Sequence, residues 1–386
     1  MKIVIAIDSF KGSLSSRDAG EAAARGVRVA APHATVRVFE LADGGEGTTD
    51  ALLSATGGRK VTMSVTGPMG TPVTADYAIL SDGTAVIEVA AAAGLPLVPP
   101  DERNPLIATT YGVGQQIANA IERGVRRFII GLGGSATNDG GVGMLAALGF
   151  RFLDGAGRDI PLGAQGLAAL SKIETAASLP TLSECEFLVA CDVDNPLCGA
   201  RGASAVYGPQ KGASVTDVAE LDAMLARYAS LTKDTLGNTA ADTPGAGAAG
   251  GLGFAFLSYL GGRLVSGVDL VIAQAKMEDE MKDADLILTG EGRLDGQSAM
   301  GKAPVGIAKA AKKHGRAVVA LAGCVTPDAR ACHEAGIDAF FPIPNRPMTL
   351  DEAMTSETAK ANIERTAEEL TRLYLCAWKN KLGGTL

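Results

Sequence analysis

The sequence predicts an α/β protein with two domains, the first of which is discontinuous. Three observations lead to this prediction. A strand, a helix and a second strand follow one another at the N-terminus, the same alternation returns near the C-terminus, and short alternating runs broken by turn residues lie between them. We therefore expect 1–60 and 285–386 to form a Rossmann-like parallel α/β domain, and 61–284 to form an inserted mixed α/β domain.

The N-terminal elements begin with residues 2–7, KIVIAI, a continuous apolar run rich in β-branched side chains. Such a run is typical of a buried strand. A Gly-containing loop follows, and a helical pattern then extends from about Ser16 to Ala30. Residues 35–41, TVRVFEL, have the composition of a second strand. The chain therefore begins with a β-α-β unit, which favours a parallel sheet.

The C-terminal region repeats this alternation of strands and helices. Three strands are expected at 284–290, 317–323 and 338–343. Helix-like segments separate them at about 303–314 and 327–335. A final helix places five apolar or aromatic residues at spacings of four and three, which is one helix face: Ile363, Ala367, Leu370, Tyr374 and Ala377.

The middle of the chain has a different pattern. Residues 60–66, 72–80 and 84–90 are short alternating runs separated by Gly and Pro, which is typical of an antiparallel meander. Further elements are expected as a helix near 112–123, a strand at 126–132, a helix near 141–148, a strand at 186–191 and a helix near 216–232. Residues 243–253, TPGAGAAGGLG, run directly into an apolar segment, so we expect a tight functional loop or a domain junction there rather than a flexible linker.

Composition excludes several classes of protein. The net charge is −8 and no basic stripe is present, which argues against nucleic acid as a partner. The six cysteines contain no Cys-x-x-Cys and the three histidines are scattered, which argues against a zinc site. No apolar run reaches the length of a membrane span, so we expect a cytoplasmic protein without a membrane partner.

Residues 133–141, GGSATNDGG, follow the strand at 126–132 and precede a helical pattern. This order points backbone N–H groups and a helix N-terminus at an anion, so it predicts phosphate binding. It is not the dinucleotide G-x-G-x-x-G motif, because Ala136 stands where the third glycine is due. The candidate nucleotide-binding residues are Gly133, Gly134, Ser135, Thr137 and Asn138.

A second predicted glycine loop, GEGRLDG at 290–296, contains Glu291, Arg293 and Asp295. Just beyond it the sequence partly matches G-x-x-x-x-G-K-[ST]. Ala303, however, replaces the hydroxyl residue that would bind Mg²⁺, and the expected strand ends too early. The segment is therefore not a P-loop.

Several expected strands end in acids, namely Asp8, then Asp43 and Glu46, and then Asp192 and Asp194. Ligands of open parallel sheets bind at the carboxyl ends of the strands, so these acids mark a candidate site. Because Asp192 follows a fully apolar strand, its carboxylate could accept a proton or hold Mg²⁺.

Cations suited to a small anionic substrate lie in three loops. Lys11 lies in DSFKGS, a Gly- and Ser-rich turn between a core strand and its helix. Arg293 lies in GEGRLDG and Lys211 in PQKG. For Lys211, a solvated surface lysine and an anion-binding residue are equally good interpretations.

Seven segments together resemble the bacterial glycerate kinase family of the first type, the glycerate 2-kinases, in the family's order and over nearly the whole chain. They are AIDSFKGSLSS at 6–16, ADGGEGT at 42–48, GLGGSATNDGG at 131–141, CDVDNPLCG at 191–199, YGPQKG at 207–212, GAAGGLGF at 247–254 and TGEGRLDGQS at 289–298. The resemblance implies an ATP- and Mg²⁺-dependent phosphotransferase that acts on D-glycerate, with a discontinuous first domain. It favours 2-phosphoglycerate as the product, and 3-phosphoglycerate is the alternative.

The motifs themselves suggest a role for each residue, because phosphoryl transfer needs positioning, charge neutralisation and a base near the hydroxyl. We assign the base to Asp192, charge stabilisation to Lys11, and substrate binding to Asp8, Ser9 and Arg293. ATP is assigned to 133–138, and Mg²⁺ to Glu291 and Asp295. ATP and D-glycerate are the expected partners, and a homodimer is left open. The rival class is a non-catalytic nucleotide-binding regulatory module; a nicotinamide-dependent dehydrogenase is disfavoured by Ala136.

Overall fold

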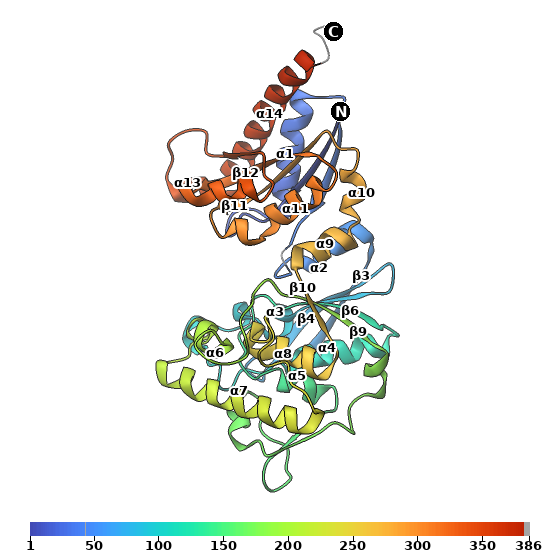
Figure 1. Cartoon of the computed structure of the whole chain (residues 1–386), viewed down its shortest axis with the longest axis vertical. Helices are drawn as coiled ribbons and strands as arrows, with labels where there is room; N and C mark the ends of the chain where they lie inside the picture. The colour runs from blue at the N-terminus through green and yellow to red at the C-terminus, as the bar shows by residue number, and fades with distance from the viewer. Residues whose placement is uncertain (43, 382–386) are drawn as a thin grey trace. The chain divides into compact units, whose positions relative to one another are not determined.

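The computed structural model describes residues 1–42 and 44–381, the last four by their backbone alone (Figure 1). The chain divides into two compact units. Unit 1 consists of Met1–Asp43 and Val268–Leu386, and unit 2 consists of Gly44–Gly267. Asp43, one of the acids predicted at strand ends, lies outside the described residues.

Unit 1 contains a five-stranded sheet in which every pair of neighbouring strands is parallel, in the order β13-β12-β11-β1-β2. Its strands are β1 (Lys2–Ile7), β2 (Thr35–Glu40), β11 (Leu286–Leu294), β12 (Ala317–Val325) and β13 (Ala339–Pro342). The predicted parallel α/β fold is therefore confirmed. The chain runs outward in one direction from β1 to β2 and in the other from β11 to β13, so β1 and β11 form a topological switch point.

Helices α1 and α14 pack against each other on one face of this sheet (Figure 1). Gly26 of α1 permits the contact, because an added Cβ would lie 2.0 Å from the carbonyl oxygen of Glu364. The N-terminus of α1 is capped by Ser15, whose hydroxyl accepts the N–H of Asp18. The helices are α1 (Ser16–Ala30), α9 (Gly267–Gln274), α10 (Met277–Met281), α11 (Ala303–Lys312), α12 (Ala331–Glu334), α13 (Leu350–Met354) and α14 (Ser356–Lys381), with 3₁₀ turns η6 (Ser298–Met300) and η7 (Pro327–Arg330).

Unit 2 contains a six-stranded mixed sheet in the order β10-β9-β6-β5-β4-β3. The predicted meander is confirmed, because β3 to β5 pair antiparallel, while β5, β6, β9 and β10 pair parallel. The strands are β3 (Gly58–Thr66), β4 (Pro72–Leu80), β5 (Ala85–Glu88), β6 (Arg127–Gly131), β9 (Glu186–Ala190) and β10 (Arg263–Val265). A separate antiparallel pair, β7 (Arg151–Leu153) and β8 (Lys172–Glu174), was not predicted.

The core of unit 2 is built from apolar helix faces and stacked aromatic rings, among them Phe128 on Phe187, whose ring centroids are 4.9 Å apart. The helices are α2 (Thr48–Thr56), α3 (Val89–Ala93), α4 (Tyr111–Glu122), α5 (Val142–Ala147), α6 (Ala203–Tyr207), α7 (Val215–Leu236) and α8 (Ala248–Tyr259). The 3₁₀ turns are η1 (Leu95–Leu97), η2 (Pro100–Glu102), η3 (Ala164–Ala169), η4 (Pro180–Glu184) and η5 (Pro209–Lys211). In the described part of the chain, no helix combines the length and apolarity that crossing a membrane requires.

Two features differ from the sequence expectations. The chain passes from one unit to the other at 43/44 and 267/268, whereas the boundaries were predicted at 60/61 and 284/285. The difference arises because α2 packs on β4 and β5 of unit 2, and α10 packs on α11 of unit 1. The segment 243–253 lies wholly within unit 2, so it is not a domain junction. It leads into α8, where Ala249, Gly250 and Gly251 interrupt the helix with left-handed backbone conformations.

Candidate active site

The first candidate site lies at the switch point of unit 1, where the loop after β1 meets β11. The Asp8 N–H donates to the carbonyl oxygen of Gly290 at 2.8 Å, and the Ser9 N–H donates to Asp8 Oδ1 at 2.7 Å. Gly292 lies against the backbone of this loop, since an added Cβ would be 3.6 Å from the backbone nitrogen of Lys11. The predicted residues Asp8, Ser9 and Lys11 are therefore adjacent to the segment that carries Glu291 and Arg293, and the Lys11 side chain is exposed.

The predicted glycine loop at 290–296 is wrong over most of its length, because β11 continues to Leu294. Gly290 pairs with Leu321 of β12, and a Cβ added at Gly290 would lie 2.0 Å from the carbonyl oxygen of Leu321. Gly290 thus allows the neighbouring backbone to approach, and the turn itself begins only at Asp295.

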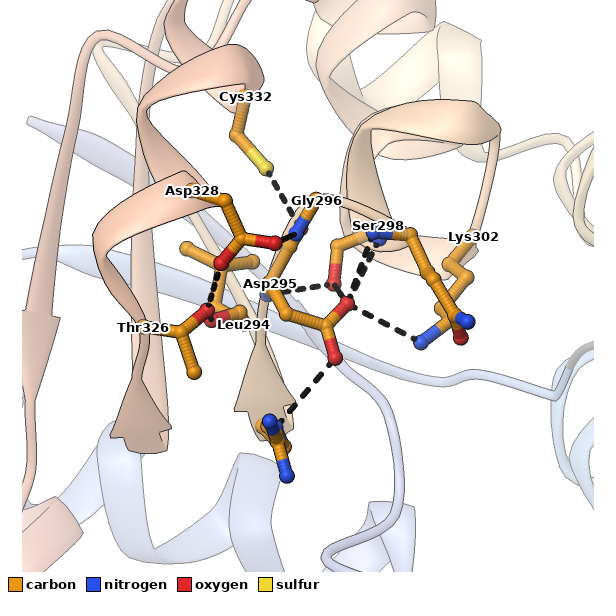
Figure 2. Close-up of polar contacts among 10 residues, drawn as sticks. Leu294, Asp295, Gly296, Ser298, Lys302, Thr326, Asp328 and Cys332 are labelled. Atoms are coloured by element: carbon orange, nitrogen blue, oxygen red, sulfur yellow. Dashed lines mark hydrogen bonds and ion pairs between the residues drawn. The ribbon is translucent and has the colours of Figure 1, made fainter.

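Asp295 organises that turn (Figure 2). Its Oδ1 accepts the N–H groups of Gln297 at 3.0 Å and Ser298 at 3.1 Å. The same oxygen lies 3.6 Å from Lys302 Nζ, and Oδ2 lies 3.4 Å from Arg293 Nε. The Arg293 side chain is 66% exposed, so its guanidinium retains donors for an anion from solvent.

A second acid, Asp328, supports the turn from the neighbouring loop. Its Oδ2 accepts the Gly296 N–H at 3.0 Å, and its Oδ1 accepts the Thr326 hydroxyl (Figure 2). Sequence reasoning missed Asp328. The signal was the pair Pro327-Asp328, which begins four residues after the strand predicted at 317–323, at the same sheet edge as the other acids.

Glu291 is the buried acid of this site. Only 8% of the residue is exposed, and burial raises the pKa of its carboxyl, although the Ser298 hydroxyl and Lys302 act in the opposite direction. Its Oε1 is buried and has no hydrogen-bond partner among the described residues.

The residues predicted to hold Mg²⁺ differ in their fit. Mg²⁺ is usually bound by one or two carboxylates together with substrate phosphates. Glu291 offers an unpartnered oxygen, whereas the Asp295 carboxylate is occupied by the turn and two cations. In the described ranges no group of three or more His, Cys, Asp or Glu side chains is placed to hold a metal. Glu291 therefore fits a magnesium ligand, and Asp295 does not.

The second candidate site lies at the carboxyl edge of the unit 2 sheet, directly after β6. Gly133 and Gly134 are exposed, and within the described residues their N–H groups have no hydrogen-bond acceptor. Gly134 has a φ of 75°, and its carbonyl oxygen accepts the Leu95 N–H at 2.8 Å. Unpaired successive N–H groups in a turn suit an anion.

The rest of the loop is buried. Ser135 Oγ and Asn138 Nδ2 have partners within unit 2, whereas Thr137 Oγ1 and Asn138 Oδ1 have no hydrogen-bond partner among the described residues. Lys211 Nζ donates to Ser135 Oγ at 3.0 Å and to the carbonyl oxygen of Thr137 at 2.6 Å. Asn138 Nδ2 donates to Ser204 Oγ at 2.9 Å. The three predicted side-chain donors, Ser135, Thr137 and Asn138, therefore lie in the interior. Lys211 is buried with them, so its interpretation as a solvated surface lysine is wrong.

The predicted anion site at the helix N-terminus after this loop is also wrong. The helix, α5, has only six residues, and the carboxylate of Asp139 already accepts two of the N–H groups at its start. Asp139 accepts from Gly141 at 3.1 Å, Gly143 at 3.2 Å and the Thr110 N–H at 2.9 Å. Burial raises the pKa of Asp139, while these hydrogen bonds lower it. On its exposed side, the loop offers an anion the backbone N–H groups of Gly133 and Gly134.

Three further acids lie at the same sheet edge. Asp192 follows β9, is exposed, and accepts the Gly267 N–H at 3.1 Å through Oδ1. Asp194 forms an ion pair with Arg201 at 2.8 Å on the surface. Glu88, which sequence reasoning missed, ends β5 and accepts the Thr49 N–H at 2.7 Å, and burial raises its pKa. Its signal was an acid closing the apolar strand AVIE.

These two units define an α/β protein with one candidate site at an edge of each sheet, which carries exposed cations in unit 1 and exposed backbone N–H groups in unit 2. The family model that matches residues 3–375 is described as the glycerate kinase family. A glycerate kinase of Bacillus subtilis is 48% identical over 96% of this chain and 97% of its own length. A glycerate 2-kinase of Escherichia coli is 45% identical over 98% of this chain and 100% of its own length.

A crystal structure from Salmonella typhimurium LT2, named as a candidate glycerate kinase 2, has a TM-score of 0.88 and 44% identity. It covers 98% of this chain and 99% of its own. The chain belongs to the glycerate kinase family, and it is therefore an enzyme of the kinase class.

Proposed function

We propose that this enzyme transfers the γ-phosphoryl group of ATP to a hydroxyl of D-glycerate and forms 2-phospho-D-glycerate. The observation that carries the proposal is the switch point of unit 1, where Lys11 and Arg293 flank the ends of β1 and β11. A small substrate with a carboxylate needs such cations. The name of the Escherichia coli relative, glycerate 2-kinase, supports the choice of product.

Within unit 1, Arg293 is the residue best suited to the substrate carboxylate, because its planar guanidinium can donate two parallel hydrogen bonds. Lys11 supplies positive charge beside it. Asp8 and Ser9 belong to the same loop and line the substrate site in this proposal. The acceptor hydroxyl would then be held by the loop after β1.

ATP is assigned to the loop of unit 2 that begins at Gly133, with the backbone of Gly133 and Gly134 as donors to phosphate. Mg²⁺ would supply neutralisation of phosphate charge, and within unit 1 Glu291 is the residue that fits it. Asp295 is proposed instead to hold the turn that carries Arg293 and Lys302.

The test is phosphorus NMR of the product formed from ATP, Mg²⁺ and D-glycerate, because the spectrum separates the 2-phospho from the 3-phospho product. We expect the 2-phospho product and little turnover of glycerol, which lacks the carboxylate. Equal turnover of glycerol would remove the carboxylate site from the proposal. ATP binding without D-glycerate-dependent ADP release would instead favour a regulatory module that binds nucleotide.

Asp192 is proposed as the general base, and Asp192→Asn tests it. Asparagine keeps an oxygen that can accept the Gly267 N–H, but it cannot take the hydroxyl proton. We expect kcat to fall by about 10²–10⁴-fold, the usual contribution of a general base, with little change in ATP affinity or thermal stability. Near-normal kcat in folded protein would exclude Asp192 from the chemistry, and partial rescue by excess Mg²⁺ would make it a metal ligand.

A further inference from the structure

Lys211 is a buried cation whose position the activity does not explain. Only 2% of the residue is exposed, and its Nζ donates to Ser135 Oγ and to the carbonyl oxygen of Thr137. Burying an ammonium group is costly unless it is paired and hydrogen-bonded. An apolar side chain of equal length would fill the same space without that cost, so the contacts themselves need an explanation.

The backbone around Lys211 is rigidly placed. Lys211 ends the 3₁₀ turn η5, and Gly212 follows with a φ of 96°. Gly212 packs so closely on the neighbouring chain that an added Cβ would lie 2.3 Å from the carbonyl oxygen of Arg103. The buried charge of Asp139 favours the protonated lysine, although burial as the larger effect lowers the pKa of Lys211 to about 7.

The opposite side of the loop is held by the turn that interrupts α8. The carbonyl oxygen of Gly250 accepts the Gly140 N–H at 3.0 Å. A Cβ added at Gly250 would lie 2.0 Å from the carbonyl oxygen of Thr137, the same oxygen that Lys211 binds. Thr137 is therefore held between Lys211 and Gly250, and Gly133 and Gly134 are the exposed residues of the loop.

We infer that Lys211 is a positioning residue for the nucleotide loop: by binding Ser135 and Thr137 from inside unit 2, it holds Gly133 and Gly134 in the shape that receives the triphosphate. This inference rests on the proposed assignment of ATP to that loop. Lys211 is not a catalytic residue, because its ammonium group is buried behind the loop and turned to Ser135 and Thr137.

The test is Lys211→Met, which keeps the length of the side chain and removes its donors. Outer residues that orient the ligands of a metal site change affinity by about 10–100-fold when removed, and we expect the KM for ATP to rise by about 10-fold. The KM for D-glycerate should stay within about twofold, because the substrate residues lie in unit 1. Lys233→Met, an exposed lysine on α7, is the matched control and should leave both constants unchanged.

Two further variants separate a failure of the Lys211 inference from a failure of the nucleotide assignment. Ser135→Ala removes one acceptor of Lys211 and leaves the lysine in place, so it serves if Lys211→Met does not fold, and we expect the KM for ATP to rise several-fold. Gly134→Ala tests the loop itself. If Gly134→Ala weakens ATP and folded Lys211→Met does not, the inference is overturned and the nucleotide assignment stands. If neither weakens ATP, the nucleotide assignment fails. A fall in kcat with both KM values unchanged would also overturn the inference.

Discussion

Two glycine-rich segments, 133–141 in unit 2 and 290–296 in unit 1, each come after an apolar run that pairs parallel with both neighbouring strands, and they have similar composition, yet they fold differently. The first leaves the sheet and turns into the interior after Gly134. The second continues as β11 to Leu294. Composition alone therefore does not separate a binding loop from a crowded strand.

The two segments contain glycine for different structural reasons. Gly134, Gly140 and Gly141 have positive φ angles of 75°, 63° and 77°, which other residues adopt only with strain. Gly290 has no such angle, and it lacks a side chain because the backbone of Leu321 comes close. Glycine serves backbone conformation in the loop and interstrand spacing in the strand.

The two segments also differ in how they can bind an anion. Around Asp295 the charged groups of Arg293 and Lys302 are exposed, so recognition there relies on side chains. In the loop of unit 2 the nearby cation, Lys211, is buried, and backbone N–H groups are what the surface offers. Side-chain recognition tolerates movement, whereas backbone recognition requires that the loop be held.

The largest expected effect is on the free energy of unfolding, when a glycine is replaced by alanine in each of the two segments. Gly290→Ala places a methyl group 2.0 Å from the Leu321 carbonyl oxygen, and overpacking of this kind costs up to about 3 kcal/mol. At Gly134 the nearest atom is 3.3 Å away, so Gly134→Ala should cost only about 1 kcal/mol through its φ angle. Urea unfolding followed by circular dichroism measures both. If both variants lost the same free energy of unfolding, the proposed difference between the strand glycine and the loop glycine would be contradicted.

Arg293→Ala probes recognition by side chains. Hydrogen bonds to a charged group contribute about 1.5–3 kcal/mol, so the KM for D-glycerate should rise by about 10–100-fold while that for ATP stays within about twofold. Steady-state kinetics with each substrate varied provide the measurement, and Arg28→Ala on α1 is the control. A higher KM for ATP alone would assign Arg293 to the triphosphate.

The burial of Lys211 should appear in the pH dependence of stability. Burial lowers its pKa from 10.5 to about 7, so above that pH the folded chain loses a proton that the unfolded chain keeps. Because the unfolded state then binds more protons, the free energy of unfolding rises with pH in this range, by on the order of 1.5 kcal/mol between about pH 7 and 8.5. Lys211→Met should lack this rise in urea unfolding. Identical pH profiles of the two proteins would show that Lys211 is not buried in solution.

The smallest expected change in stability concerns the turn within α8 that holds the loop of unit 2. Ala249 has a φ of 51°, a left-handed conformation that costs a residue with a Cβ about 1 kcal/mol or more. Ala249→Gly should therefore stabilise unit 2 by up to about 1 kcal/mol, as a shift in the urea midpoint. A destabilised variant would mean that the alanine methyl contributes packing that outweighs the strain.

Much of the fold could be predicted from the sequence because the strong signals are local. The runs at 2–7 and 317–323 are apolar, the run at 72–80 alternates, and each is a strand in the structure. The unit boundaries were missed because α2 and α10 are assigned to their units by what they pack on, the sheet for α2 and helix α11 for α10. Periodicity does not contain that information.

The candidate sites were predictable in position but not in orientation. Strand ends marked the edges at which Asp8, Asp192 and Gly133 lie. Which way Ser135, Thr137 and Asn138 face depends on Lys211 and Ser204, more than 60 residues later in the chain. The same holds for Asp139, whose carboxylate satisfies the helix end that was expected to bind a phosphate.

The position of β1 inside the unit 1 sheet, between β11 and β2, has a consequence for synthesis on the ribosome. β1 pairs with β2 soon after the chain emerges, but its other neighbour, β11, begins only at Leu286. At about 5–20 residues per second, one edge of β1 stays without its partner for on the order of tens of seconds, while the whole of unit 2 is made and can fold. We expect nascent chains arrested before β11 to carry a folded unit 2 and an exposed apolar strand edge, which is the state that chaperones recognise.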